Sequence, residues 1–194
     1  MRSVLINYLS LIAFLLLVTL AAGRGAMLRR RGINAFVFGV TDKSDFLLMP
    51  VVAFFFYSIL ASVLGLPLPD VLRKTFFANA VTGWIGIIIC YGSLIWLAFA
   101  LKSFGKSFRI GIDEATQDKL VTSGMFSISR NPVYVAFISF LIGMILIYPN
   151  LAACIAFVLF AAAIHRQILR EEKFLRGHYG EEYEDYCNRV RRYL

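Results

Sequence analysis

Long runs without a charged residue constrain this chain more than any other feature. The first extends from Val4 to Ala22, the second from Phe46 to Leu66 and the third from about Ala80 to Leu101. A helix needs about 20 apolar residues to cross the hydrocarbon core of a membrane. Each run meets that length, so we expect an integral membrane protein built from helices.

Two shorter apolar runs, Val133–Tyr148 and Leu151–Ile164, flank a Pro149-Asn150 turn signal. Each is short for an independent crossing, so we expect a tight hairpin whose polar ends are buried or line a wet cavity. The expected fold class is therefore all-α, a polytopic bundle of about five transmembrane helices. It forms one domain over residues 1–194, with three spans in 1–101 and a cytosolic loop, the hairpin and the tail in 102–194.

Two features of the long runs allow further interpretation. The first run, preceded by Arg2, has the alternative interpretation of a cleaved signal peptide, although it is longer than a usual signal core. The third run contains Gly and Ser residues that would let another helix approach closely. Neither interpretation changes the expected fold class.

The net charge of +8 is distributed unevenly along the chain. Most basic residues lie after the first run, after the third run and after the hairpin. Five crossings would put these three groups on one side, and the positive-inside rule makes that side the cytosol. We therefore expect the N-terminus outside and the tail in the cytosol, at the plasma (inner) membrane if the protein is bacterial.

The same residues argue against other classes of partner. No basic helix with interleaved aromatic residues stands apart from a span, which argues against a nucleic-acid partner. The three cysteines have no CxxC spacing, and the two histidines have no ligand spacing, so we expect no metal site. The oligomeric state stays open.

The first long polar segment ends in Asn131-Pro132, which predicts the start of a helix with Asn131 as its cap. The positive end of that helix, beside Arg130, favours a carboxylate or a phosphate. The alternative is that Asn131 is only a cap and Arg130 only an interfacial charge.

The second polar segment, His165–Leu194, begins as a continuation of the hairpin's second helix. Its adjacent Glu171 and Glu172 would bind ribose hydroxyls or an ammonium group. The alternative is a solvated charged helix with a Glu172–Arg176 pair.

A stripe of apolar and tyrosine residues at helical spacing predicts an amphipathic tail helix, either a lid over a site or an interfacial anchor. The members of the stripe are Tyr179, Tyr183, Tyr186, Val190 and Tyr193.

Two sequence runs flank the hairpin, LVTSGMFSISRNPVY before it and EEKFLRGHYGEEYEDYCNRVRRY after it. Together they resemble the isoprenylcysteine carboxyl methyltransferase and phospholipid methyltransferase families of integral membrane enzymes, from Phe104 to the end of the sequence. The resemblance implies an S-adenosylmethionine-dependent methyltransferase with a cytosol-facing cofactor pocket. A lipophilic or lipidated acceptor would reach that pocket from membrane lipid, through a gap between helices.

By matching position, the resemblance implies cofactor-binding roles for Leu120, Val121, Gly124, Asn131, Tyr134, Glu171 and Glu172. It implies catalytic roles, including pairing with a carboxylate of the acceptor or the cofactor, for Arg130, Arg166, Arg170 and Glu171.

The chain departs from the family pattern at three places. Asn131 stands where the pattern has His, Met125-Phe126 where it has Pro-Tyr, and Arg191 where it has the terminal Pro. Asn cannot change charge near neutral pH as His can, so we expect position 131 to bind rather than to act as an acid or base.

A second resemblance starts at His165, where HR-x(4)-EE-x(6)-YG is similar to the end of the sterol C14-reductase family, which binds NADPH. Those enzymes have more spans than this chain can provide. A membrane reductase and a non-catalytic membrane protein are the alternatives to a methyltransferase. A prenylated cysteine, a phospholipid amine and a lipophilic thiol or phenol are all compatible acceptors.

Overall fold

The computed structural model describes residues 4–30, 48–77, 79–104 and 120–194. These ranges contain α1 (Val4–Arg29), α2 (Leu48–Leu64), α3 (Asp70–Arg73), α4 (Ala80–Phe104), the 3-10 turn η3 (Gly124–Ser127), α5 (Pro132–Ile147), α6 (Leu151–Tyr179) and α7 (Glu181–Arg189). The expected all-helical class is confirmed. Three parts of the expectations lie outside the described residues: the start of the second span at residues 46–47, the basic residues Arg31 and Lys43, and loop residues 105–119.

Three of the described helices are long and apolar enough to cross a membrane, namely α1 over Val4–Met27, α4 over Ala80–Ser103, and α6. The apolar helices α2 and α5 are shorter, so five crossings remain a prediction. The second half of the hairpin is longer than its apolar run suggested. The helix continues through the charged residues after Ile164 and reaches 29 residues.

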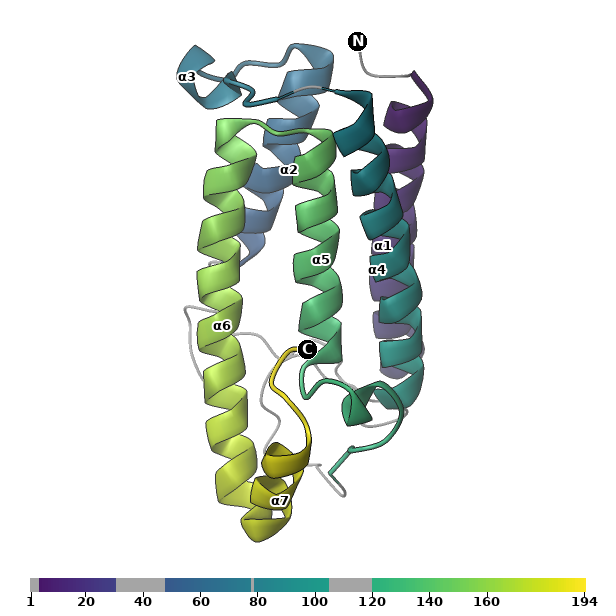
Figure 1. Ribbon diagram of the computed structural model, residues 1–194, viewed down its shortest axis with the longest axis vertical. Helices are drawn as coiled ribbons and strands as arrows, with labels where there is room; N and C mark the ends of the chain where they lie inside the picture. The colour runs from purple at the N-terminus through teal and green to yellow at the C-terminus, as the bar shows by residue number, and fades with distance from the viewer. Residues whose placement is uncertain (1–3, 31–47, 78, 105–119) are drawn as a thin grey trace.

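The other long helices pack along the hairpin or along each other (Figure 1). α4 lies along α5, α1 lies along α4, and α2 lies along α6. α4 and α5 approach each other closely at Gly86 and Gly143. A Cβ atom on Gly86 would lie 2.5 Å from the Gly143 carbonyl oxygen. The third span therefore uses small residues for close packing, as its sequence predicted.

The closed end of the hairpin, the turn Tyr148–Asn150, is fixed by neutral polar groups. The Asn150 side chain accepts a hydrogen bond from Ala153 N at 2.7 Å and donates to Ser62 Oγ at 3.2 Å. The Tyr148 and Ser10 hydroxyls share a hydrogen bond of 2.8 Å. Backbone hydrogen bonds also join this turn to Lys74 and Phe76. The turn is therefore tied to α1, to α2 and to the segment before α4.

At the opposite, open end, α6 extends past the start of α5 and α7 folds back against that extension (Figure 1). Gly180, with φ of +54°, makes the reversal without the strain that a side chain would add. The expected tail stripe is only partly helical. α7 ends at Arg189, and the next residue, Val190, is extended. The prediction that Val190 and Tyr193 belong to the tail helix is therefore wrong.

Candidate functional site at the open end of the hairpin

Four segments meet at the open end: the loop before α5, the first turn of α5, the second half of α6, and α7 with residues 190–194. α7 buries Tyr183 and Tyr186, and the Tyr186 hydroxyl donates to Phe126 O at 2.7 Å. Beyond α7, Arg130 N donates to Arg191 O at 2.9 Å. The tail thus lies over the open end and is hydrogen-bonded to the loop.

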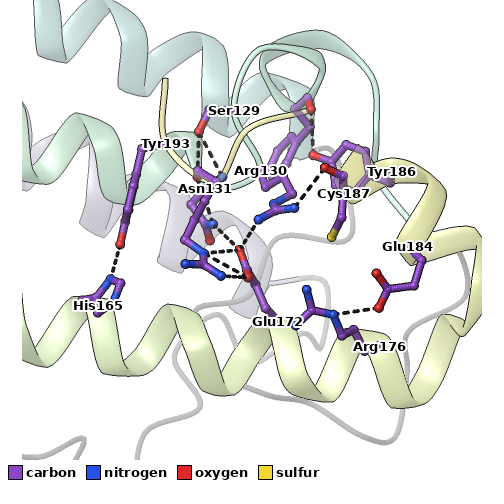
Figure 2. Close-up of polar contacts among 12 residues, drawn as sticks. Ser129, Arg130, Asn131, His165, Glu172, Arg176, Glu184, Tyr186, Cys187 and Tyr193 are labelled. Carbon is purple, nitrogen blue, oxygen red and sulfur yellow. Dashed lines mark hydrogen bonds and ion pairs between the residues drawn. The ribbon is translucent and has the colours of Figure 1, made fainter. Parts of the chain in front are cut away.

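A buried carboxylate lies at the centre of this end (Figure 2). Glu172 is 2% exposed and accepts hydrogen bonds from Arg192 at 2.8–3.1 Å. Arg130 approaches from the other side, with its guanidinium 3.2 Å from Glu172 Oε1. Two arginines distant in sequence therefore neutralise one glutamate. The suggested Glu172–Arg176 pair is wrong, since Arg176 binds Glu184 instead, at 2.8 Å.

Asn131 occupies the N-cap position of α5, as predicted, but its side chain belongs to the same cluster as Glu172. Its side chain makes no capping hydrogen bond to α5. Asn131 Nδ2 donates to Glu172 Oε1 at 3.4 Å and to Arg192 O at 3.2 Å. Because these two acceptors hold the amide nitrogen, Asn131 joins α5, α6 and residues 190–194.

A second cluster surrounds the neighbouring carboxylate. Glu171 Oε1 accepts from the Tyr134 hydroxyl at 2.7 Å and from Gln167 Nε2 at 2.9 Å. Arg170 donates to the side-chain oxygen of Gln167. Tyr134 and Gln167 are both buried, so one side chain from α5 and one from α6 help to orient Glu171. The two adjacent glutamates therefore have different environments.

The remaining sequence-derived candidates lie around these clusters. Leu120 and Val121 are half-buried, whereas Arg166 is exposed. Gly124 has φ of +63°, and a Cβ atom there would lie 2.4 Å from Ser103 Oγ. The same hydroxyl accepts a hydrogen bond from Met125 N at 3.0 Å. Packing alone therefore explains a glycine at position 124, because the absence of a side chain lets the loop lie against α4.

Sequence reasoning did not identify Gln167 or Arg192 as site residues. Gln167 lies one turn before Glu171 on a helix rich in charged residues, and its spacing to Glu171 was the available signal. Arg192 was assigned to the last turn of a helix that ends earlier, so its pairing with Glu172 depends on a tertiary contact.

Electrostatics fix the charge states around the cluster. Burial raises the pKa of Tyr183 and of Tyr186 above the ordinary tyrosine value, so both stay neutral at physiological pH. Hydrogen bonding to Glu172 raises the pKa of Arg192, so this residue stays cationic. The Arg130 Nε is buried with no hydrogen-bond acceptor among the described residues. A buried arginine N–H without an acceptor suits a ligand that carries a carboxylate.

A phospholipid methyltransferase family model matches residues 78–182, from before α4 into α7. The chain belongs to this family. The match includes Tyr134, Glu171 and Glu172 and ends before residues 190–194.

Named relatives agree with the family. A probable protein-S-isoprenylcysteine O-methyltransferase from Oryza sativa subsp. indica is 30% identical over 110 residues, which cover 55% of this chain and 58% of the relative. Protein-S-isoprenylcysteine O-methyltransferase B from Arabidopsis thaliana is 33% identical over 94 residues, which cover 47% and 48%. The chain spans about half the length of the curated relatives that it matches. Family and relatives indicate a methyltransferase, and the apolar helices indicate an integral membrane protein.

Proposed function

We propose that this protein transfers a methyl group from S-adenosylmethionine to a lipophilic acceptor at the membrane–cytosol interface. The acceptor would be isoprenylcysteine-carboxylate-like or lipid-like. The observation that carries the proposal is the partly buried Tyr134–Glu171 hydrogen bond at the open end of the hairpin, inside the region that matches the phospholipid methyltransferase family. The names of the relatives favour the isoprenylcysteine type of acceptor.

The residues at the open end fit the methyl donor by their chemistry. S-adenosylmethionine carries a carboxylate, an ammonium group and a sulfonium, and when bound it supplies an activated methyl group. Arg130 would hold the carboxylate with its unpaired buried Nε. Glu171, oriented by Tyr134 and Gln167, would hold a cationic or hydroxyl group. Leu120, Val121, Gly124 and Asn131 would complete the cofactor-binding residues by position.

In this proposal Glu172 supports the site rather than contacting the donor. Both of its oxygens are held by Arg192, and Arg130 is also paired with it. A carboxylate with such partners cannot turn towards a ligand without leaving buried charge unpaired, at a cost of several kcal/mol, about 3–5 by analogy with buried pairs.

The proposed mechanism requires little acid–base chemistry from the protein's side chains. A carboxylate acceptor needs no general base, so the protein has to hold it in line at roughly 3–3.5 Å from the methyl carbon. The buried tyrosines of α7 would help to exclude water and so strengthen the contacts to the charged donor. An amine, thiol or phenol acceptor would require a base, and Glu171 would be that base. Arg166 and Arg170 would bind the acceptor's carboxylate.

The proposed orientation has the open end in the cytosol and the N-terminus outside. The C-terminal ends of α1 and α4, whose last turns contain Arg29 and Lys102, lie at the same end of the bundle as the start of α5, which follows Arg130. This end is opposite α3 and the N-terminus (Figure 1). This clustering of basic residues agrees with the positive-inside rule.

The alternatives are a membrane reductase and a non-catalytic membrane protein. The family match and the methyltransferase relatives do not favour the reductase. Calorimetry with the detergent-solubilised protein would separate the three. S-adenosylmethionine binding without NADPH binding supports the proposal, and binding of NADPH alone contradicts it. Binding of neither favours the non-catalytic protein.

The activity itself is tested by transfer of labelled methyl groups to prenylcysteine analogues and to lipid extracts. We expect transfer by the wild type, loss in Glu171→Gln, and near-normal transfer in Glu181→Gln, which changes an exposed glutamate of α7. Transfer that survives Glu171→Gln would overturn the role proposed for Glu171. Absence of transfer to every acceptor would overturn the proposed reaction.

A further inference from the structure

Residues 190–194 connect the two helices of the hairpin at its open end. On the α5 side, Arg191 O accepts from Arg130 N, and Arg192 O accepts from Ser129 Oγ at 3.4 Å. On the α6 side, the Arg192 guanidinium holds Glu172, and the Tyr193 hydroxyl hydrogen-bonds to His165 Nδ1. Figure 2 shows Ser129, Arg130 and Asn131 of the loop opposite Glu172 and His165 of α6, with Tyr193 hydrogen-bonded to His165. This segment therefore lies across the open end and contacts both sides of it.

Arg192 makes two kinds of contact at once. Its side chain binds both oxygens of Glu172, at 3.0 Å and 2.8 Å to Oε2 and at 3.1 Å to Oε1. Its main-chain oxygen accepts a hydrogen bond from Asn131 Nδ2. The salt bridge thus fixes the place of the carbonyl group that contacts Asn131.

These contacts determine which way the Asn131 amide faces. A carboxylate and a carbonyl oxygen both accept hydrogen bonds only, so they require the –NH₂ side of the amide. The two N–H groups of Asn131 are directed at Glu172 and Arg192 O. The amide oxygen consequently faces away from both, on a residue that is 8% exposed.

We infer that Arg192 is a positioning residue that fixes the Asn131 amide, so that Asn131 Oδ1 accepts a hydrogen bond from an amine of the methyl donor. This inference rests on the proposed function. It adds residues 190–194, beyond the stretch that matches the family, to the site. Arg192 itself does not touch the ligand.

If Arg192 affects ligand binding only by holding the Asn131 amide, the losses of affinity from substituting the two residues should not add. Full-length protein in detergent is titrated with S-adenosylmethionine in four forms: wild type, Arg192→Gln, Asn131→Ala and the double variant. We expect each single variant to bind roughly tenfold more weakly, as for the loss of one hydrogen bond to a charged group. The double variant should bind no more weakly than Asn131→Ala alone. A merely structural role for Arg192 would instead add to the loss from Asn131→Ala.

Two controls complete the experiment. Arg189→Gln changes an exposed arginine of α7 whose Nε contacts only the Asp185 carbonyl oxygen at 3.2 Å among the described contacts, and it should bind as the wild type does. Arg192→Lys keeps the charge but loses the two-pronged geometry, so it should recover part of the affinity. If Arg192→Gln does not fold, Arg192→Lys takes its place in the double-variant comparison.

The outcomes separate this inference from the proposed function. Wild-type protein that binds no S-adenosylmethionine overturns the proposed function and the inference with it. Wild-type binding with full binding by the Arg192 variants overturns only the inference. Losses of S-adenosylmethionine affinity that add in the double variant also overturn only the inference.

Discussion

The α5–α6 hairpin is held by neutral side chains at its closed end and by charged side chains at its open end. At the closed end, Asn150 and Tyr148 hydrogen-bond to hydroxyl and amide groups of α1 and α2. At the open end, Arg130, Glu172 and Arg192 form a buried ionic cluster. The same two helices are therefore positioned by two different chemistries.

This difference separates a purely structural end from a functional one. Neutral hydrogen bonds suffice to fix a turn, and they avoid the cost of burying charge. A buried ionic cluster is costly unless every partner is present, and such clusters are concentrated at functional sites. In this account the closed end determines where the helices lie, and the open end uses charge to orient groups towards a ligand.

Removing the charge of Glu172 should lower the stability of the protein more than any substitution at the closed end. Glu172→Gln leaves Arg130 and Arg192 without their carboxylate, and we expect a loss of about 3 kcal/mol of stability. The matched control is Glu184→Gln, since the Arg176–Glu184 pair has the same 2.8 Å separation but is exposed. An exposed pair contributes about 1 kcal/mol or less. Thermal unfolding in detergent measures both, and equal losses would contradict the distinction between them.

Asn150→Ala tests the closed end alone. It removes the cap on Ala153 N and the hydrogen bonds to α2, so we expect a loss of about 2 kcal/mol. The control Asn79→Ala removes a similar cap, the 2.9 Å bond from Thr82 N, at an exposed position whose side chain makes no hydrogen bond to another helix among the described contacts. It should cost about 1 kcal/mol. Binding of S-adenosylmethionine should survive both changes, and selective loss in Asn150→Ala would mean that the closed end also serves the ligand.

The sharpest test uses two tyrosines at opposite ends of α5. Tyr134→Phe removes the hydrogen bond to Glu171, and Tyr148→Phe removes those to Ser10 and Asn7. Each should cost about 1 kcal/mol of stability. Only Tyr134→Phe should weaken binding of S-adenosylmethionine, by up to roughly tenfold, because only this change removes a hydrogen bond that orients Glu171. Similar binding by the two variants would remove the functional distinction between the ends.

Alkaline pH should lower the stability of the open end, by less than the substitutions above. Burial raises the pKa of Tyr183 and Tyr186 above the unfolded value of about 10. Their contribution to stability is therefore complete below about pH 10 and is lost as the pH rises through the folded values. Tyrosinate absorbance should show a late-titrating pair, absent in a Tyr183→Phe, Tyr186→Phe double variant. Titration of all tyrosines together would mean that α7 is not packed as described.

The helices and the turn of the hairpin were predictable from sequence because apolar runs and a Pro-Asn pair are local signals. Tyr134 was found through a family resemblance, whereas the two adjacent glutamates were already candidates from their chemistry and their place on the hairpin's second helix. Their different environments were not predictable, because Glu172 is defined by Arg130 and Arg192, which approach from distant parts of the chain. The end of α7 at Arg189 was also missed. Helical spacing continued in the sequence, whereas the contact between Arg191 O and Arg130 N draws the chain into an extended form.

The most direct test of the central claim is photocrosslinking of labelled S-adenosylmethionine to the full-length protein, followed by mapping of the labelled peptides. We expect label in peptides from residues 120–134 or 165–194, and loss of this label when unlabelled S-adenosylmethionine competes. Specific label confined to peptides around Ser58, Ser62 or the Tyr148–Asn150 turn would place the donor at the closed end and contradict the account.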